Sequence, residues 1–120
     1  MQMQMLLVDD HTIVREGLRR ILETTGEPWG ITEESSGFRA LEFLRGARCD
    51  MAIVDLSMPG MSGLELIRRI RVDRPRLPVL VLSMHAEEQY ALRAFKAGAN
   101  GYLTKDSAAA ELVHAVRKVA

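Results

Sequence analysis

The segment "MAIVDLSMPGMSGLELI" (51–67) carries the strongest fold signal in the chain. It opens with an unbroken apolar run that ends at Asp55, continues through a short loop, and then changes to helical periodicity. A continuous aliphatic run is typical of a strand buried on both faces, as in a parallel sheet. The sequence Ser62-Gly63-Leu64-Glu65 fits a capping box, which predicts a helix start. The segment is therefore expected to form one strand–loop–helix unit.

The same alternation extends outward over the whole chain. Strands are expected at 4–9, 30–35, 51–55, 78–83 and 100–103. The apolar faces expected for the intervening helices are Val14, Leu18, Ile21 and Leu22; Phe38, Leu41 and Leu44; Leu66, Ile67 and Ile70; Tyr90, Ala91, Ala94 and Phe95; and Leu112, Val113, Val116 and Ala120. Strands alternating with helices imply right-handed crossovers and a doubly wound α/β fold. Because no linker or repeat interrupts the pattern, residues 1–120 are expected to form one domain.

Two further residues mark expected helix ends. Gly26 is expected at C′ of the first helix, and Ser107 is expected to cap the last one. Gly17 and Gly63 are expected to permit close packing where they stand.

The composition narrows the class of protein. Of the 120 residues, 48% are apolar and 27% are charged, which is typical of a globular domain. Sixteen basic and sixteen acidic residues cancel, so the domain lacks the positive excess of a nucleic-acid binder. No apolar run approaches the ~20 residues of a membrane span, and the N-terminus lacks the basic region of a signal peptide. A single cysteine, Cys49, excludes an internal disulfide and suggests a reducing cytosol.

The ends of the predicted strands carry the chemistry. In doubly wound sheets, ligands bind beyond the carboxyl ends of the strands. The residues there are Asp9, Asp10, Asp55, Ser83 and Tyr102–Lys105. Three carboxylates in one crevice repel each other, and a hard divalent cation such as Mg²⁺, or Mn²⁺, would relieve that repulsion with oxygen ligands.

The same residue types suit phosphoryl transfer. An aspartate can act as a nucleophile and form an aspartyl-phosphate. Asp55 is the best candidate because it stands alone at the end of its strand, before a loop that could leave it exposed. Lys105 and Ser83 would supply a cation and a hydroxyl to the transferred group.

At this point a resemblance is plain. The chain resembles the receiver domain of a bacterial two-component response regulator over essentially all of its length. The motifs that carry the resemblance are the acidic pair after the first strand, "DLSMPGMSGLELI" (55–67), Ser83 after the fourth strand, and "GYLTKDS" (101–107) at the fifth. "DDHTIVREGL", "VLSMH" and "KAGANGYLTKDS" resemble the NarL/FixJ (LuxR-type) subgroup in particular. The resemblance implies a flavodoxin-like (βα)5 fold with strand order 2-1-3-4-5.

The resemblance also implies a role for each site residue. Asp55 would accept a phosphoryl group from a phosphohistidine on a sensor histidine kinase. Asp10, the Asp55 side chain and the backbone carbonyl of Ser57 would bind Mg²⁺ directly, and Asp9 would bind it through water. Lys105 would pair with the phosphoryl oxygens. Neighbouring residues of an extended chain point to opposite sides, which agrees with unequal roles for Asp9 and Asp10.

A switch would follow from phosphorylation. The resemblance implies that Ser83 moves to hydrogen-bond the phosphoryl group while Tyr102 turns inward behind it, and that Ser57 and His85 tune the loss of that group to water. The fourth helix has a weak apolar stripe, so it is expected to be loosely held and able to shift. Asp106 stands where many receivers have proline, and a trans bond is expected there.

The resemblance also implies which domains and subunits this receiver would act on. A C-terminal helix-turn-helix domain, which would bind DNA and control transcription, is expected in the full-length protein, and the receiver itself would catalyse only its own phosphorylation and dephosphorylation. A stand-alone receiver that acts through protein–protein contacts is the alternative. Subunits would pair through the first and fifth helices or through the fourth-helix side. A cytoplasmic location, with no membrane and no nucleic acid bound by this domain alone, is also implied.

Three other functions fit less well. A haloacid-dehalogenase-type enzyme wants a second aspartate two residues after the nucleophile, where Ser57 stands. A flavodoxin-like flavin carrier would need a hydroxyl-rich phosphate loop after the first strand, where the chain has "DDHT". A receiver that works without phosphorylation generally lacks an acidic residue or the lysine, and this chain has them all.

The remaining candidates receive structural interpretations. His11 is expected to have a structural or rim role, and His85 and His114 have no histidine partner at zinc-ligand spacing. Cys49 is expected to be a partly buried small hydrophobe. The arginine-rich segment "RRIRVDRPR" (68–76) is expected to be the solvated end of the third helix and its loop.

Overall fold

The computed structural model describes residues 2–120, which form five strands and five α-helices in strict alternation. The elements are β1 (Gln4–Val8), α1 (Thr12–Glu23), β2 (Gly30–Glu34), α2 (Gly37–Leu44), β3 (Met51–Asp55), α3 (Gly63–Asp73), β4 (Val79–Ser83), α4 (Glu88–Ala97), β5 (Gly101–Thr104), a 3₁₀ turn η1 (Lys105–Ser107) and α5 (Ala108–Val119). Every predicted strand boundary is correct to within one residue.

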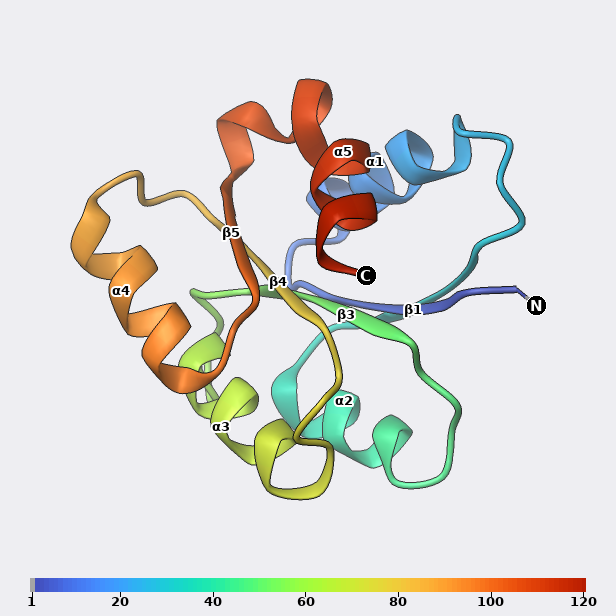
Figure 1. Ribbon diagram of the computed structural model, residues 1–120. Coiled ribbons are helices and arrows are strands. Elements are labelled where there is room, and N and C mark those ends of the chain that lie inside the picture. Colours follow the sequence, from blue (N-terminus) through green and yellow to red (C-terminus); the bar gives the residue numbers. More distant parts are fainter. Residues whose placement is uncertain (1) are drawn as a thin grey trace.

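The strands form one parallel sheet in the order β2-β1-β3-β4-β5, as the resemblance implied. Helices α1 and α5 cover one face, and α2, α3 and α4 cover the other (Figure 1). The central strands β3 and β4 are buried along their whole length, which explains why their sequences are continuous aliphatic runs. All carboxyl ends of a parallel sheet lie at one edge, so the residues that follow the strands share one rim.

The core has one layer on each side of the sheet. Leu18 and Leu22 of α1 pack with Leu112 and Val116 of α5 on one face. On the other face, α3 supplies Leu66, Ile67 and Ile70, while α2 supplies Ala40 and Leu44, and α4 supplies only Ala94 and Ala97. Three predicted core residues are wrong: Phe38 is 61% exposed, Phe95 is 47% exposed, and Ala120 is exposed just beyond the end of α5. The short helix α2 buries Ala40 and Leu44 and leaves Phe38 outside. Helix α4 buries only two alanines and leaves Phe95 outside.

The helix ends agree with the sequence in part. Ser62 caps α3 by accepting a hydrogen bond from Glu65 N, but the Glu65 carboxylate pairs with Arg69 instead of closing the capping box. Ser36 caps α2 in the same way, which the sequence reading missed. Ser107 occupies the N-cap position of α5 as predicted, but its hydroxyl bonds to Thr104 Oγ1 across η1 and makes no capping bond. Gly26 does have positive φ, but it lies one residue beyond C′, because Thr24 is the C-cap of α1.

The arginine-rich segment is less solvated than predicted. Arg71 donates hydrogen bonds to Gly98 O and Leu77 O, at 2.6 Å each, and so holds the loop before β5 to the end of α3. Arg74 donates to Leu44 O and Ala47 O at the end of α2. These two arginines satisfy backbone carbonyls, whereas Arg68, Arg69 and Arg76 are exposed as expected.

No peptide bond within residues 2–120 is cis, so the bond before Asp106 is trans as expected. Cys49 is half-buried, and burial raises the pKa of its thiol. None of the helices in the described part of the chain is long and apolar enough to span a membrane.

Candidate functional site

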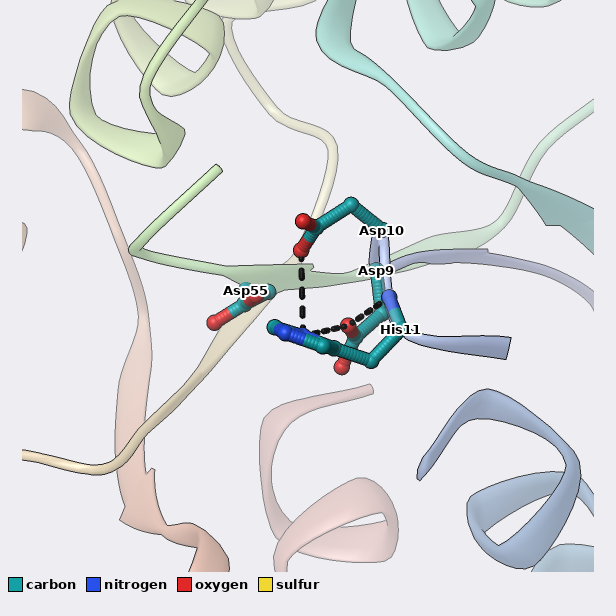
Figure 2. Close-up of side chains that lie close together, drawn as sticks. All are labelled: Asp9, Asp10, His11 and Asp55. Atoms are coloured by element: carbon teal, nitrogen blue, oxygen red, sulfur yellow. Dashed lines mark hydrogen bonds and ion pairs between the residues drawn. The ribbon is translucent and has the colours of Figure 1, made fainter. Parts of the chain in front are cut away.

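The predicted site residues converge at the carboxyl edge of the sheet. Asp9 follows β1, Asp55 ends β3, Ser83 ends β4 and Lys105 follows β5. The parallel register pairs Val8 with Val54 on neighbouring strands, so the two acidic positions that follow lie side by side. Figure 2 shows Asp9, Asp10 and His11 on the loop after β1, facing Asp55.

Lys105 lies between the two most buried carboxylates. Its Nζ atom is 3.2 Å from Asp9 Oδ2 and 3.3 Å from Asp55 Oδ1. The side chains of Asp9 and Asp55 are only 1% and 3% exposed. One ammonium therefore serves two carboxylates that are removed from water, and one negative charge remains uncompensated in this pair.

The electrostatics of Asp55 reflect that shortage of positive charge. Burial, and then repulsion from Asp9, raise the pKa of Asp55, while the ion pair with Lys105 opposes the rise. Ser57 N donates a long hydrogen bond of 3.4 Å to Asp55 Oδ1. The positive charge around Asp55 is therefore too small to compensate its ionised carboxylate fully.

Asp9 and Asp10 have different surroundings. Asp9 Oδ1 accepts a hydrogen bond from His11 N at 2.9 Å, and its other oxygen pairs with Lys105. Asp10 is more exposed, at 23%, and its Oδ1 atom lies 3.2 Å from His11 Nδ1. Asp9 is therefore tied into the protein framework, and Asp10 is the freer carboxylate.

The donor set fits a divalent cation. One ligand atom from each of Asp9, Asp10, His11 and Asp55 lies within 4.8 Å of the others. Within residues 2–120, Asp9 Oδ2, Asp10 Oδ1 and Asp55 Oδ2 are buried and have no hydrogen-bond partner. Buried carboxylate oxygens are costly without a hydrogen bond or a cation, and oxygen ligands favour hard ions such as Mg²⁺.

Ser83, Tyr102 and His85 form a second group beside the carboxylates. Ser83 Oγ accepts a hydrogen bond from His85 N at 3.0 Å, and the Tyr102 hydroxyl donates to His85 O at 2.6 Å. The His85 ring stacks on Tyr90 of α4, with centroids 4.1 Å apart. The loop between β4 and α4 is thus attached to Ser83 at one end and to α4 at the other.

Arg15 is a residue of the site that sequence reasoning missed. Its Nη1 atom donates a 2.6 Å hydrogen bond to the backbone carbonyl of Asp9, and its Nε atom donates a 2.9 Å hydrogen bond to Glu33 of β2. Arg19 donates to the other oxygen of Glu33. The sequence did contain a signal for this contact. Arg15 lies about one and a half helical turns after the acidic pair, next to the inward face formed by Val14 and Leu18.

Comparison with known proteins decides the family. The family model for the response regulator receiver domain matches residues 5–117 of the chain. The chain belongs to this family. Receiver domains are signalling modules that work with histidine kinases, and the site described above lies within the matched range.

Two regulators illustrate the similarity. The chain is 40% identical to response regulator UvrY of Escherichia coli (strain K12) over 114 residues, which is 95% of the chain and 52% of UvrY. It is 36% identical to transcriptional regulatory protein DegU of Brevibacillus brevis over 119 residues, or 99% of the chain and 50% of DegU. The chain therefore spans about half the length of these relatives.

Solved structures agree with the fold and with the subgroup. A LuxR-family two-component response regulator from Aurantimonas sp. SI85-9A1 superposes with a TM-score of 0.91 at 38% identity, covering 99% of this chain and 85% of that one. The subgroup is therefore NarL/FixJ (LuxR-type), as the sequence motifs indicated. TrrA of Thermotoga maritima, solved in complex with Mg²⁺–BeF, has a TM-score of 0.88 at 29% identity over 99% of this chain and 100% of that one.

Proposed function

We propose that this receiver is a phosphorylation-controlled switch in which Asp55 accepts a phosphoryl group from the phosphohistidine of a sensor kinase. The observation that carries the proposal is the surroundings of Asp55: a 3%-exposed carboxylate at a strand end, held 3.3 Å from a lysine, with one oxygen that lacks a hydrogen-bond partner among the described residues. A nucleophilic carboxylate needs such a free oxygen, and the transferred group needs nearby positive charge.

The transfer forms one bond and breaks one. A carboxylate oxygen of Asp55 attacks phosphorus, and the phosphorus–nitrogen bond to the kinase histidine breaks with its electron pair remaining on the imidazole. The product is an acyl phosphate on Asp55. Lys105 neutralises part of the added charge, which is roughly −1.5 to −2 at neutral pH for a phosphoryl group.

Asp10, Asp55 and the Ser57 carbonyl would hold Mg²⁺ directly, with Asp9 acting through water. The bound cation would offset the carboxylate charges and the charge on the phosphoryl oxygens. Two buried carboxylate oxygens that accept no hydrogen bond within the described chain, Asp10 Oδ1 and Asp55 Oδ2, support this arrangement. The link between Asp9 and Lys105 supports the weaker role of Asp9, because that carboxylate already has a cation.

The switch would begin at Ser83. Its hydroxyl now accepts from His85 N, and a phosphoryl group on Asp55 would offer it an acceptor for its own proton. Movement of Ser83 would pull on the His85 segment, which also carries the hydrogen bond from Tyr102 and the stack on Tyr90. Tyr102 would then turn inward and α4 would shift. Ser57 and His85, at the edge of the same pocket, would set how fast water removes the phosphoryl group.

The output of the full protein is also a proposal. UvrY and DegU are named as regulators, and this chain corresponds to about half of each. We infer a C-terminal helix-turn-helix domain that binds DNA. Changes in α4, β5 and α5 would release this domain from the receiver or bring two subunits together, and the homodimer would be the DNA-binding form. The cytoplasm is the expected location. A stand-alone receiver that controls a protein partner is the alternative.

Intact-mass spectrometry tests the phosphoacceptor function. The chain is incubated with Mg²⁺ and acetyl phosphate, and its mass is compared with that of Asp55→Asn and of Asp50→Asn, an aspartate on the loop before β3. The proposal expects one added phosphoryl group on the wild type and on Asp50→Asn, and none on Asp55→Asn. An unchanged wild-type mass, or equal addition to all three proteins, would reject it.

A further inference from the structure

His11 lies closer to the carboxylate cluster than a rim residue needs to. We propose that His11 supplies a nitrogen ligand to the cation site, so that this receiver binds transition-metal ions such as Ni²⁺ with a stronger preference over Mg²⁺ than an all-oxygen site gives. The inference rests on the proposed function, because it concerns the cation site of the same pocket. In this inference, His11 helps to determine which metal ion the pocket binds.

The backbone fixes His11 beside the carboxylates. His11 N donates to Asp9 Oδ1 at 2.9 Å, which closes a tight turn immediately before α1 begins at Thr12. That turn brings the ring back over the pocket, with Nδ1 3.2 Å from Asp10 Oδ1 and 3.4 Å from Asp9 Oδ1 (Figure 2). An Nδ1 atom that carries a proton can pair with these carboxylates. Without that proton, its lone pair is available to a cation that the same carboxylates bind.

The carboxylates provide an independent indication of that cation. Asp55 is 97% buried, and its Oδ2 atom has no hydrogen-bond partner in the described part of the chain. Asp10 Oδ1, the oxygen nearest His11 Nδ1, has none either within residues 2–120. The four candidate ligand atoms lie within 4.8 Å of one another. Ligands on opposite sides of a divalent ion are about 4.2 Å apart, so small side-chain movements suffice to bring them to one ion.

The ring has the freedom to make such a movement. His11 is 59% exposed, and its side chain does not cap α1. Rotation about its side-chain bonds therefore costs little packing. The carboxylates are more fixed, because Lys105 and the His11 amide hold Asp9.

A nitrogen ligand changes the metal preference in a known direction. Mg²⁺ takes oxygen ligands almost exclusively and keeps several waters. Imidazole suits first-row transition metals, whose affinities rise from Mn²⁺ through Co²⁺ and Ni²⁺ toward Cu²⁺. His11 should therefore add much to Ni²⁺ binding and little to Mg²⁺ binding.

Calorimetric titration tests the ligand role. MgCl₂ and NiCl₂ are titrated separately into the wild type, His11→Gln and His114→Gln in a buffer that does not coordinate metals. His114 is the matched control because it is an exposed histidine on α5, away from the pocket. We expect His11→Gln to weaken Ni²⁺ binding by roughly 10- to 100-fold, the range seen when metal-site support is lost. Mg²⁺ binding should change less than about threefold, and His114→Gln should leave the pocket affinity for both ions unchanged. An unaltered ratio of Ni²⁺ to Mg²⁺ affinity in His11→Gln would overturn the inference.

A spectroscopic readout makes the result independent of folding. Substoichiometric Mn²⁺ should broaden the ring-proton NMR signals of His11 before those of His85 or His114. Equal broadening of all three rings would contradict a cation bound beside His11.

Asp10→Asn separates this inference from the proposed function. If the wild type binds no Mg²⁺, or if Asp10→Asn binds it equally well, the cation site of the proposed function fails, and this inference fails with it. If Mg²⁺ binding depends on Asp10 but the metal preference is indifferent to His11→Gln, only the present inference fails.

Discussion

Gly63 packs directly against the backbone of Asp55. A Cβ atom at Gly63 would collide with the Asp55 carbonyl oxygen and lie 2.7 Å from Leu56 Cα. Gly63 N also donates a 2.9 Å hydrogen bond to Leu56 O. The first residue of α3 thus holds the end of β3, and with it the carboxylate proposed to accept the phosphoryl group.

Alanine at position 63 should therefore disturb both the fold and the site. Because backbone atoms cannot move aside as a flexible side chain can, we expect Gly63→Ala to lower the free energy of unfolding by about 1–3 kcal/mol. Phosphorylation of Asp55 should also become slower. Urea denaturation measures the first effect, and the rate of mass gain with acetyl phosphate measures the second.

Gly17 provides the matched control. It lies inside α1, and apart from the adjoining backbone of that helix no described atom comes within 4 Å of a Cβ built there, so the close packing expected of Gly17 is not found. Gly17→Ala should stabilise the chain by ~0.5–1 kcal/mol by removing flexibility from a helix interior. A Gly63→Ala protein as stable as the wild type would contradict the close approach to Asp55.

Ionised Asp55 should destabilise the metal-free fold. Because burial and Asp9 raise the pKa of Asp55, the folded chain binds this proton more tightly than the unfolded chain. Protonated Asp55 is favourable below the ordinary aspartate pKa of about 3.9, and this stability is lost as pH rises through the raised value. Asp55→Asn should therefore melt at a higher temperature than the wild type at pH 7 without metal. The difference should shrink at acid pH.

Asp50→Asn should have the opposite sign at pH 7. Gln4 N and Arg48 donate hydrogen bonds to Asp50, and these lower the pKa of its carboxyl group. Its ionised form thus supports the fold above the ordinary aspartate pKa, and this support is lost as pH falls through the lowered value. Thermal melts of both variants between pH 3 and pH 7, a range chosen to span that ordinary value of about 3.9, provide the test. Equal shifts in both variants would show that the site has no special charge shortage.

The Glu33 network should support the position of Asp9. Hydrogen bonds from Arg19, and then from Arg15, lower the pKa of Glu33, so its contribution is present above the ordinary glutamate pKa and is lost as pH falls through the lowered value. Glu33 is partly exposed, so we expect Glu33→Gln to cost no more than about 1 kcal/mol at pH 7. Arg15→Gln should cost more, because it also removes the bond to Asp9 O. Equal unfolding free energies for the two variants would contradict that bond's contribution.

Helix α4 should be the least protected of the core-facing helices. It buries only Ala94 and Ala97, whereas α3 buries Gly63, Leu66, Ile67 and Ile70. Local opening requires little loss of apolar contact there, so backbone amides of α4 should exchange with deuterium faster than those of α3. Exchange in α4 that is as slow as in α3 would rule out a loosely held switch element.

The fold was predictable from the chain because its signals are local and repeated. Strands such as 51–55 and 79–83 are buried on both faces, so this burial is visible in their sequences as continuous apolar runs. The location of the site followed from topology alone, since parallel strands bring Asp9, Asp55 and Lys105 to one edge. The approach of Gly63 to Asp55 had only a weak local signal.

The missed features depend on partners far away in the sequence. Helical period places Phe38 and Phe95 on an inward face, but it cannot show how much of that face a short helix leaves uncovered. Arg71 and Arg74 look like surface charges until the carbonyls of Gly98 and Leu44 appear beside them. His11 depends on a turn closed by the side chain of Asp9, which the spacing of residues does not reveal.

The attachment point of the phosphoryl group tests the central claim most directly. An acyl phosphate is reduced by sodium borohydride to an alcohol, which converts a phosphorylated aspartate into homoserine. The chain is treated with Mg²⁺ and acetyl phosphate, reduced, digested and sequenced by mass spectrometry. The proposed switch predicts homoserine at position 55 alone. Homoserine at position 9 or 10, or a phosphoryl group on His11 with position 55 unmodified, would contradict it.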